Sequence, residues 1–178
     1  MDINALSSLG FVSSIDFADK NLNTSGRVAV HQNKFEIENT LADFVYGDTQ
    51  NQVEMIGAHT LHIDDYTGED IVIAVLDAGF PNVNTMQAFQ RLRDNNDLLN
   101  GYDFVNRTNN VYAYTGNTHG TKVLSDMAGF IQDNFVGTAP DASYYLFRTE
   151  DAATENPVEE SYWVEAAERA DSLGVNII

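Results

Sequence analysis

Residues 71–79 read Ile-Val-Ile-Ala-Val-Leu-Asp-Ala-Gly, and this stretch decides the fold class of the chain. Its first six residues are apolar and mostly β-branched, which is typical of a strand buried on both faces of a parallel sheet. Asp77 ends the apolar run, and Ala78-Gly79 lets the chain turn without a bulky side chain beside the carboxylate. Catalytic groups and ligands collect at the carboxyl ends of strands in open α/β sheets, so Asp77 is a candidate catalytic residue. The alternative is that Asp77 only caps a turn or a helix start.

Helix and strand patterns alternate after this strand. Residues 120–131 carry apolar side chains at spacings of three and four, which predicts a helix with one apolar face. Residues 143–147 predict a second strand, and residues 175–178 predict the beginning of a third. This alternation favours an α/β domain that has a parallel sheet with crossover helices. Because an apolar strand needs neighbours for its backbone groups, we expect the chain to be truncated before the end of the domain.

The helix between these last two strands has the clearest boundary signals. Asn156 is a good N-cap, Pro157 fits the first helical position, and Glu159 completes a capping pattern. Gly174 supplies the C-terminal stop. One apolar face is expected from Val158, Tyr162, Trp163, Ala166, Ala170 and Leu173. Tyr144, Tyr145 and Trp163 are predicted to be core residues.

The charge balance excludes several classes of partner. The 178 residues contain 27 acidic and 9 basic side chains, for a formal net charge of -18. Such a polyanion repels phosphate backbones and anionic lipid surfaces, which argues against nucleic acid and against membrane binding. No apolar run reaches the roughly 20 residues of a membrane-spanning helix, so no membrane insertion is expected. The chain has no cysteine, which excludes disulfides, thiolate metal sites and a cysteine nucleophile.

Two short segments could hold metal ions. The acidic composition makes calcium a candidate structural ion, and residues 94–97 (Asp-Asn-Asn-Asp) form an oxygen-rich stretch. They lack the ligand spacing and the glycine of an EF-hand loop, which favours a solvated turn. His59 and His62 have a spacing that could hold a metal on a helix, but an ordinary surface pair is the simpler interpretation. No cofactor is required by any motif.

His119 is the second candidate catalytic residue. It opens the predicted helix in the sequence Thr-His-Gly-Thr at residues 118–121. A histidine that is held by a buried aspartate is the usual general base, because the aspartate fixes the imidazole tautomer and stabilises the imidazolium. The order aspartate, then histidine, occurs in one known catalytic triad. The alternative is that His119 only satisfies free backbone N–H groups at the helix start.

Four ordered motifs together resemble the subtilases, which are the subtilisin-like serine proteases. They are Val-Leu-Asp-Ala-Gly at 75–79, Gly-Tyr-Asp-Phe-Val at 101–105, His-Gly-Thr at 119–121 and Gly-Thr-Ala-Pro-Asp-Ala at 137–142. The resemblance covers about residues 60–178. It implies a three-layer subtilisin-like fold, with Asp77 as the triad aspartate and His119 as the general base. It further implies a secreted, monomeric endopeptidase that acts on protein or peptide substrates, although the chain shows no signal peptide.

The resemblance also defines what is missing or changed. The family usually has serine or threonine where Ala78 stands, and often a second histidine where Lys122 stands. The Gly-Thr-Ser motif that carries the nucleophile does not occur. Residues 43–178 are therefore expected to be the N-terminal part of the peptidase domain, and residues 1–42 the end of a pro-segment with a linker. We expect the isolated chain to have no proteolytic turnover.

Three other functions remain open from the sequence. A subtilase-like domain without a nucleophile could bind peptides or a partner protein as a non-catalytic module. A nucleotide-binding α/β domain is disfavoured because no Gly-x-Gly-x-x-Gly follows the strand at residues 71–76. A phosphoacceptor role for Asp77 would leave the His-Gly-Thr motif unexplained.

Overall fold

The computed structural model describes residues 44–154 and 156–178, so the pro-segment predicted at residues 1–42 lies outside the described residues. The elements of the described part follow one another as helices α2 (Gln50–Met55) and α3 (Ala58–Ile63), strand β1 (Val72–Asp77), the 3₁₀ turn η2 (Gln87–Phe89), helix α4 (Gln90–Asn95), strand β2 (Tyr102–Asp103), helix α5 (His119–Ala128), strands β3 (Phe130–Ile131), β4 (Phe135–Val136) and β5 (Ser143–Arg148), and helix α6 (Val158–Ser172). None of these helices is long and apolar enough to cross a membrane.

The main sheet is parallel and has the strand order β1-β5-β2. Strands β1 and β5 pair along their whole length, from Val72 beside Ser143 to Asp77 beside Arg148. The predicted third strand adds to β1 through a parallel bridge between Ile73 and Ile177, where the Ala74 N–H donates to the Ile177 carbonyl at 2.9 Å. The parallel sheet with crossover connections that the sequence predicts is therefore confirmed.

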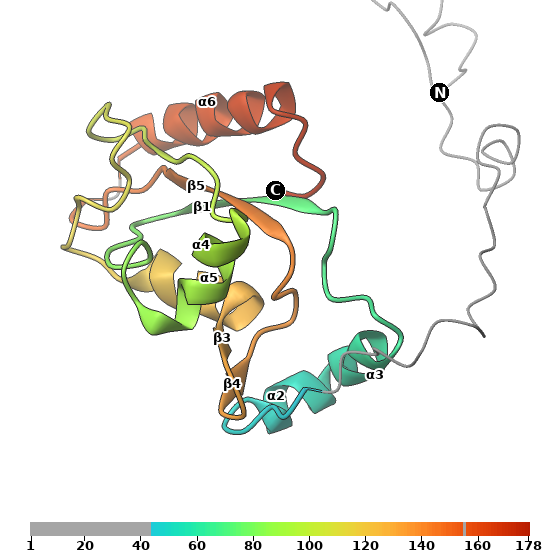
Figure 1. Cartoon of the computed structure of the whole chain (residues 1–178). Coiled ribbons are helices and arrows are strands. Elements are labelled where there is room, and N and C mark those ends of the chain that lie inside the picture. The colour runs from blue at the N-terminus through green and yellow to red at the C-terminus, as the bar shows by residue number, and fades with distance from the viewer. Residues whose placement is uncertain (1–43, 155) are drawn as a thin grey trace, which may run out of the picture. The chain divides into compact units, whose positions relative to one another are not determined.

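Helices cover both faces of this sheet and make three layers, with α6 on one side and α4 and α5 on the other (Figure 1). The side chains of β1 and β5 alternate between the two cores. Ile73, Val75, Tyr144 and Leu146 join the core with Leu92, Leu124 and Ala128 on the α4 and α5 side. Ala74 and Phe147 join the core with Ala166 and Ala170 of α6. This alternation explains why both strands read as continuous apolar runs.

Helix α5 is shorter than the sequence predicts. It ends at Ala128, and Ile131 belongs to β3, which pairs antiparallel with β4. Gly129 adopts extended backbone angles, and its carbonyl accepts the Gly137 N–H at 2.7 Å. The helix thus ends before Gly129, and the chain continues into a short hairpin. The apolar residue Ile131 of this hairpin happens to continue the helical spacing, which is why the sequence suggested another helical turn.

Helix α6 lies where the sequence predicts and ends before Gly174 as predicted. Its N-terminal cap and its buried face differ from the prediction. Gly174 has the positive φ (+76°) expected after a helix. No side chain caps the N-terminus. The Asn156 side chain donates instead to the Thr154 hydroxyl at 2.8 Å, and the Glu159 carboxylate accepts the Asp151 N–H at 3.0 Å.

Only two members of the predicted apolar face of α6, Ala166 and Ala170, are buried. Trp163 is 54% exposed, so its predicted place in the core is wrong, whereas Tyr144 is fully buried as predicted and Tyr145 is partly buried. Periodicity identifies an apolar face, but it does not show how much of that face meets a neighbour.

Candidate functional site

Asp77 is the last residue of β1, and its side chain is 8% exposed. The Ala78 N–H donates to its Oδ1 at 2.6 Å, which fixes the carboxylate close to its own backbone. The Asp77 carbonyl accepts the N–H of Thr149, the residue after β5, at 3.0 Å. The carboxylate is therefore held at the carboxyl edge of the sheet, where the sequence places it.

His119 is the first residue of α5 and lies over Asp77. Its Nδ1 is 2.8 Å from Asp77 Oδ2 and 3.0 Å from Oδ1. The Asn117 side chain accepts the His119 backbone N–H at 2.7 Å and fixes the start of the helix. The ring contacts the carboxylate through Nδ1, and the His119 side chain remains 65% exposed to solvent. The structure brings the two predicted residues into direct contact.

Gly120 makes this close approach of α5 to β1 sterically feasible. A Cβ atom built there would lie 2.7 Å from the Gly79 carbonyl oxygen and 3.0 Å from the Asp77 Cβ. Real Cβ atoms are not found at the first of these distances. The next residue, Thr121, then ties the helix to the turn, since its N–H donates to Gly79 O at 3.2 Å and its hydroxyl to Pro81 O at 2.9 Å.

The pair has the hydrogen-bonding arrangement of a general base. Because an ionised carboxylate only accepts hydrogen bonds, contact with Asp77 favours the tautomer of a neutral imidazole that carries its proton on Nδ1. In that tautomer, the lone pair is on Nε2. Within residues 44–154 and 156–178, no serine hydroxyl is hydrogen-bonded to His119.

Arg148 is a residue of this edge that sequence reasoning missed. It ends β5 as the register partner of Asp77, and it is 1% exposed. Its Nε donates to the Ala78 carbonyl at 2.9 Å, and its Nη1 lies 3.2 Å from an oxygen of the fully buried Asp103. The rule that selected Asp77, a charged residue at the carboxyl end of an apolar strand, could also have selected Arg148.

The predicted histidine pair is not a surface pair. His62 is fully buried, with the Tyr46 hydroxyl 2.8 Å from Nδ1 and the Thr138 carbonyl 2.9 Å from Nε2. Both ring nitrogens therefore have protein partners. The simpler interpretation is wrong for His62, because its ring packs against the Phe44 and Tyr46 rings and contacts the Thr138 carbonyl in the loop after β4.

Residues 94–97 form the end of α4 and the turn that follows it. Asn96 adopts a left-handed conformation at the helix C-terminus, and Asp97 accepts the Ser143 hydroxyl at 2.8 Å. In the described part of the chain, no group of three or more His, Cys, Asp or Glu side chains is placed to hold a metal ion. A structural calcium ion stays a prediction.

No protein-family model and no curated protein matches the chain. Solved structures do match it. MycP1, crystallised with its N-terminal propeptide removed, is 23% identical with a TM-score of 0.52, and the match covers 71% of this chain and 35% of MycP1. The MycP3 protease from the type VII (ESX-3) secretion system is 19% identical with a TM-score of 0.54, and the match covers 75% of this chain and 36% of MycP3.

These likenesses show the fold of the chain. The described residues share the α/β architecture of the subtilisin-like serine proteases, so the resemblance that the sequence motifs indicate is confirmed at the level of the fold. The chain spans about a third of the length of the structures that it matches.

Proposed function

We propose that the chain supplies Asp77 and His119 to the catalytic triad of a serine endopeptidase. The single observation that carries the proposal is the contact between the His119 Nδ1 and the buried Asp77 carboxylate, at 2.8 Å, with the rest of the imidazole exposed. The protease fold of the structural neighbours supports it. In this proposal, the nucleophilic serine and the oxyanion donors come from outside the 178 residues.

The proposed mechanism assigns one proton movement to each residue. His119 Nε2 takes the proton of the serine hydroxyl as the oxygen attacks the peptide carbonyl, and it later gives this proton to the leaving amine. The resulting acyl-enzyme is hydrolysed by a water molecule that His119 activates in the same way. Asp77 does not take the proton, but it orients the ring and stabilises the imidazolium while the proton is on His119.

The family resemblance supplies the rest of the proposal. The substrate would be a protein or a peptide, and the enzyme would act as a monomer outside the cell. No cofactor would take part in the chemistry. Calcium would have only a structural role, which suits hard oxygen ligands in an acidic protein.

Labelling with a fluorophosphonate tests the proposal, because this probe reacts with a serine only when a base activates it. The reading frame is extended beyond Ile178 until it includes a Gly-Thr-Ser motif, and the product is labelled and assayed for peptide hydrolysis. His119→Ala and Asp77→Ala are expected to lower the hydrolysis rate by about 10⁴-fold or more. His59→Ala is the matched control, since His59 belongs to α3 and should leave the rate unchanged.

Two results would contradict the proposal. An extended protein that folds but neither labels nor hydrolyses peptides would indicate a non-catalytic binding module of the same fold. Hydrolysis by the 178-residue chain alone that depends on His119 would show that the nucleophile lies within these residues.

A further inference from the structure

Each of the three guanidinium nitrogens of Arg148 has a partner at the edge of the sheet that carries the Asp77–His119 pair. Its Nε donates to Ala78 O at 2.9 Å, its Nη1 approaches the two Asp103 oxygens at 3.2 and 3.3 Å, and its Nη2 lies 3.6 Å from an Asp151 oxygen. The guanidinium carbon lies 3.6 Å from the centre of the Tyr114 ring. An arginine that is 1% exposed needs such partners, because an unpaired buried charge is very costly.

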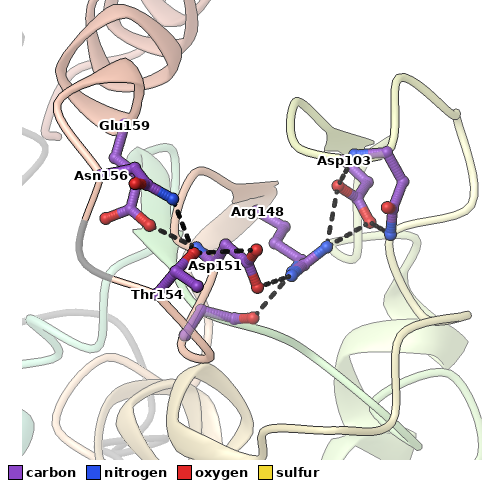
Figure 2. Close-up of polar contacts among 8 residues, drawn as sticks. Asp103, Arg148, Asp151, Thr154, Asn156 and Glu159 are labelled. Atoms are coloured by element: carbon purple, nitrogen blue, oxygen red, sulfur yellow. Dashed lines mark hydrogen bonds and ion pairs between the residues drawn. The ribbon is translucent and has the colours of Figure 1, made fainter.

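Figure 2 shows how this network is arranged: Arg148 lies between Asp103 on one side and Asp151 on the other. Asp103 belongs to β2, and it also accepts two hydrogen bonds from Asn106. Asp151 follows β5, and its backbone N–H donates to Glu159 in the first turn of α6. Arg148 therefore connects the ends of two strands with the beginning of α6.

The backbone of Ala78 transmits this connection to the Asp77 carboxylate. The Ala78 N–H donates to Asp77 Oδ1 at 2.6 Å, and the Ala78 carbonyl accepts from Arg148 Nε at 2.9 Å. The same Oδ1 atom lies 3.0 Å from the Nδ1 of His119. Because Ala78 has no side-chain hydroxyl that could support the carboxylate, its backbone orientation is the local support for Asp77.

We propose that Arg148 is a positioning residue for the Asp77–His119 pair. It holds the Ala78 carbonyl, and thereby keeps the Ala78 N–H and the Asp77 carboxylate in the orientation that binds Nδ1 of His119. A catalytic role for Arg148 rests on the proposed function. Its structural role concerns only the Asp77–His119 pair, which the chain itself contains. A planar guanidinium is suited to this task, since it serves a carbonyl and a carboxylate at fixed angles, which a lysine ammonium does not.

The tautomer of His119 provides a direct test in the 178-residue chain. The ring is labelled with ¹⁵N, and the chemical shifts of its two nitrogens are measured by NMR, because they report which nitrogen carries the proton. In the wild type, the Nδ1–H tautomer is expected to dominate. Arg148→Lys keeps the charge but loses the Nε donor to Ala78 O, and it is expected to change the His119 spectrum to that of a mixture of both tautomers.

Two further variants keep the test decisive. Asp151→Asn removes only the negative charge beside Nη2, and the Asp151 side chain is 38% exposed, so this variant should fold even if Arg148→Lys does not. A smaller change in the same direction is expected. Arg107→Lys is the matched control, because Arg107 also binds a carboxylate and lies 5.2 Å from a tyrosine ring centre, but it is exposed and pairs with α6.

The proposal is overturned if folded Arg148→Lys keeps the wild-type His119 spectrum. If that variant does not fold, an unchanged spectrum in Asp151→Asn overturns it, as does an equal change in Arg107→Lys. The measurement needs no turnover, so a chain without peptidase activity can still support this inference, and failure here leaves the labelling experiment unaffected.

Discussion

Asp77 and Arg148 are register partners on β1 and β5, and both are bound to the backbone of the same residue, Ala78. Asp77 accepts the Ala78 N–H, and Arg148 donates to the Ala78 carbonyl. The backbone of one residue, Ala78, thus connects the proposed catalytic carboxylate with the buried guanidinium. This relationship makes the edge of the sheet a single hydrogen-bonded unit.

Asp77→Asn is expected to invert the preferred tautomer of His119. An amide at this position can donate a hydrogen bond to Nδ1, which leaves the proton on Nε2 and removes the lone pair that would act as base. In an active extended enzyme, the corresponding loss of kcat should be about 10⁴-fold, as the loss of the triad aspartate produces in other serine proteases. The control is Asp133→Asn, at an exposed turn. A wild-type rate in Asp77→Asn would remove Asp77 from the mechanism.

Gly120→Ala should destabilise the fold although alanine favours helices. The new Cβ would lie 2.7 Å from Gly79 O and also meet the Phe80 ring, so α5 must move away from β1. Overpacking of this kind costs about 1–3 kcal/mol of unfolding free energy, measured by urea denaturation. Lys122→Ala, on the exposed face of the same helix, should have an effect close to zero. Equal stability of the two variants would contradict the close-approach argument.

Asp103→Ala is expected to cost about 3–5 kcal/mol of unfolding free energy, because it leaves the buried Arg148 without its main counter-charge. The two side chains are 0% and 2% exposed, so water cannot replace the lost partner. Glu165→Ala breaks the exposed pair with Arg107 and serves as the comparison. Its melting temperature should stay near that of the wild type, since exposed ion pairs contribute little. Similar effects of both substitutions would show that burial does not determine the strength of the Arg148 pair.

Tyr144→Phe should change the stability in a pH-dependent way. The Tyr144 hydroxyl donates to Ala139 O at 2.8 Å, and loss of this bond should cost about 1 kcal/mol at neutral pH. Burial raises the pKa of Tyr144 above its ordinary value, so the folded state holds this proton more tightly than the unfolded chain. The contribution is therefore complete below about pH 10 and is lost as the pH rises further. Urea unfolding at neutral and alkaline pH should show the two proteins converging, and a constant difference would contradict this account.

The sequence predicted the elements whose signal is local and strong. The strand at residues 71–76, the helix that begins at His119 and the strand at residues 143–147 all form, because each depends on its own apolar pattern. The contact between Asp77 and His119 also followed, since both residues lie at the ends of elements that pack together.

Two of the features that sequence reasoning missed, the burial of His62 and the Arg148 network, depend on contacts between distant residues. The burial of His62 depends on Tyr46 and on Thr138, which lies 76 residues away, and no local pattern encodes this contact. Asn156 has the composition of a helix cap, but its amide finds Thr154 as a partner instead. The Arg148 network likewise joins residues 45 and 70 positions apart.

The buried cation also has a consequence for how the chain finds its fold. A slip of one residue between β5 and its neighbours would turn Arg148 to the opposite face of the sheet, towards the core that contains Phe147 and α6, and would move its charge away from Asp103. Such a misfolded sheet would bury an unpaired guanidinium, whereas the apolar residues of β1 and β5 would tolerate many alternative alignments. We expect the ion pair to favour the native strand register during folding, because shifted alignments would leave its charges unpaired. A double variant with leucine at both positions, Asp103→Leu with Arg148→Leu, should then stay compact while its NMR spectrum shows several slowly exchanging conformers.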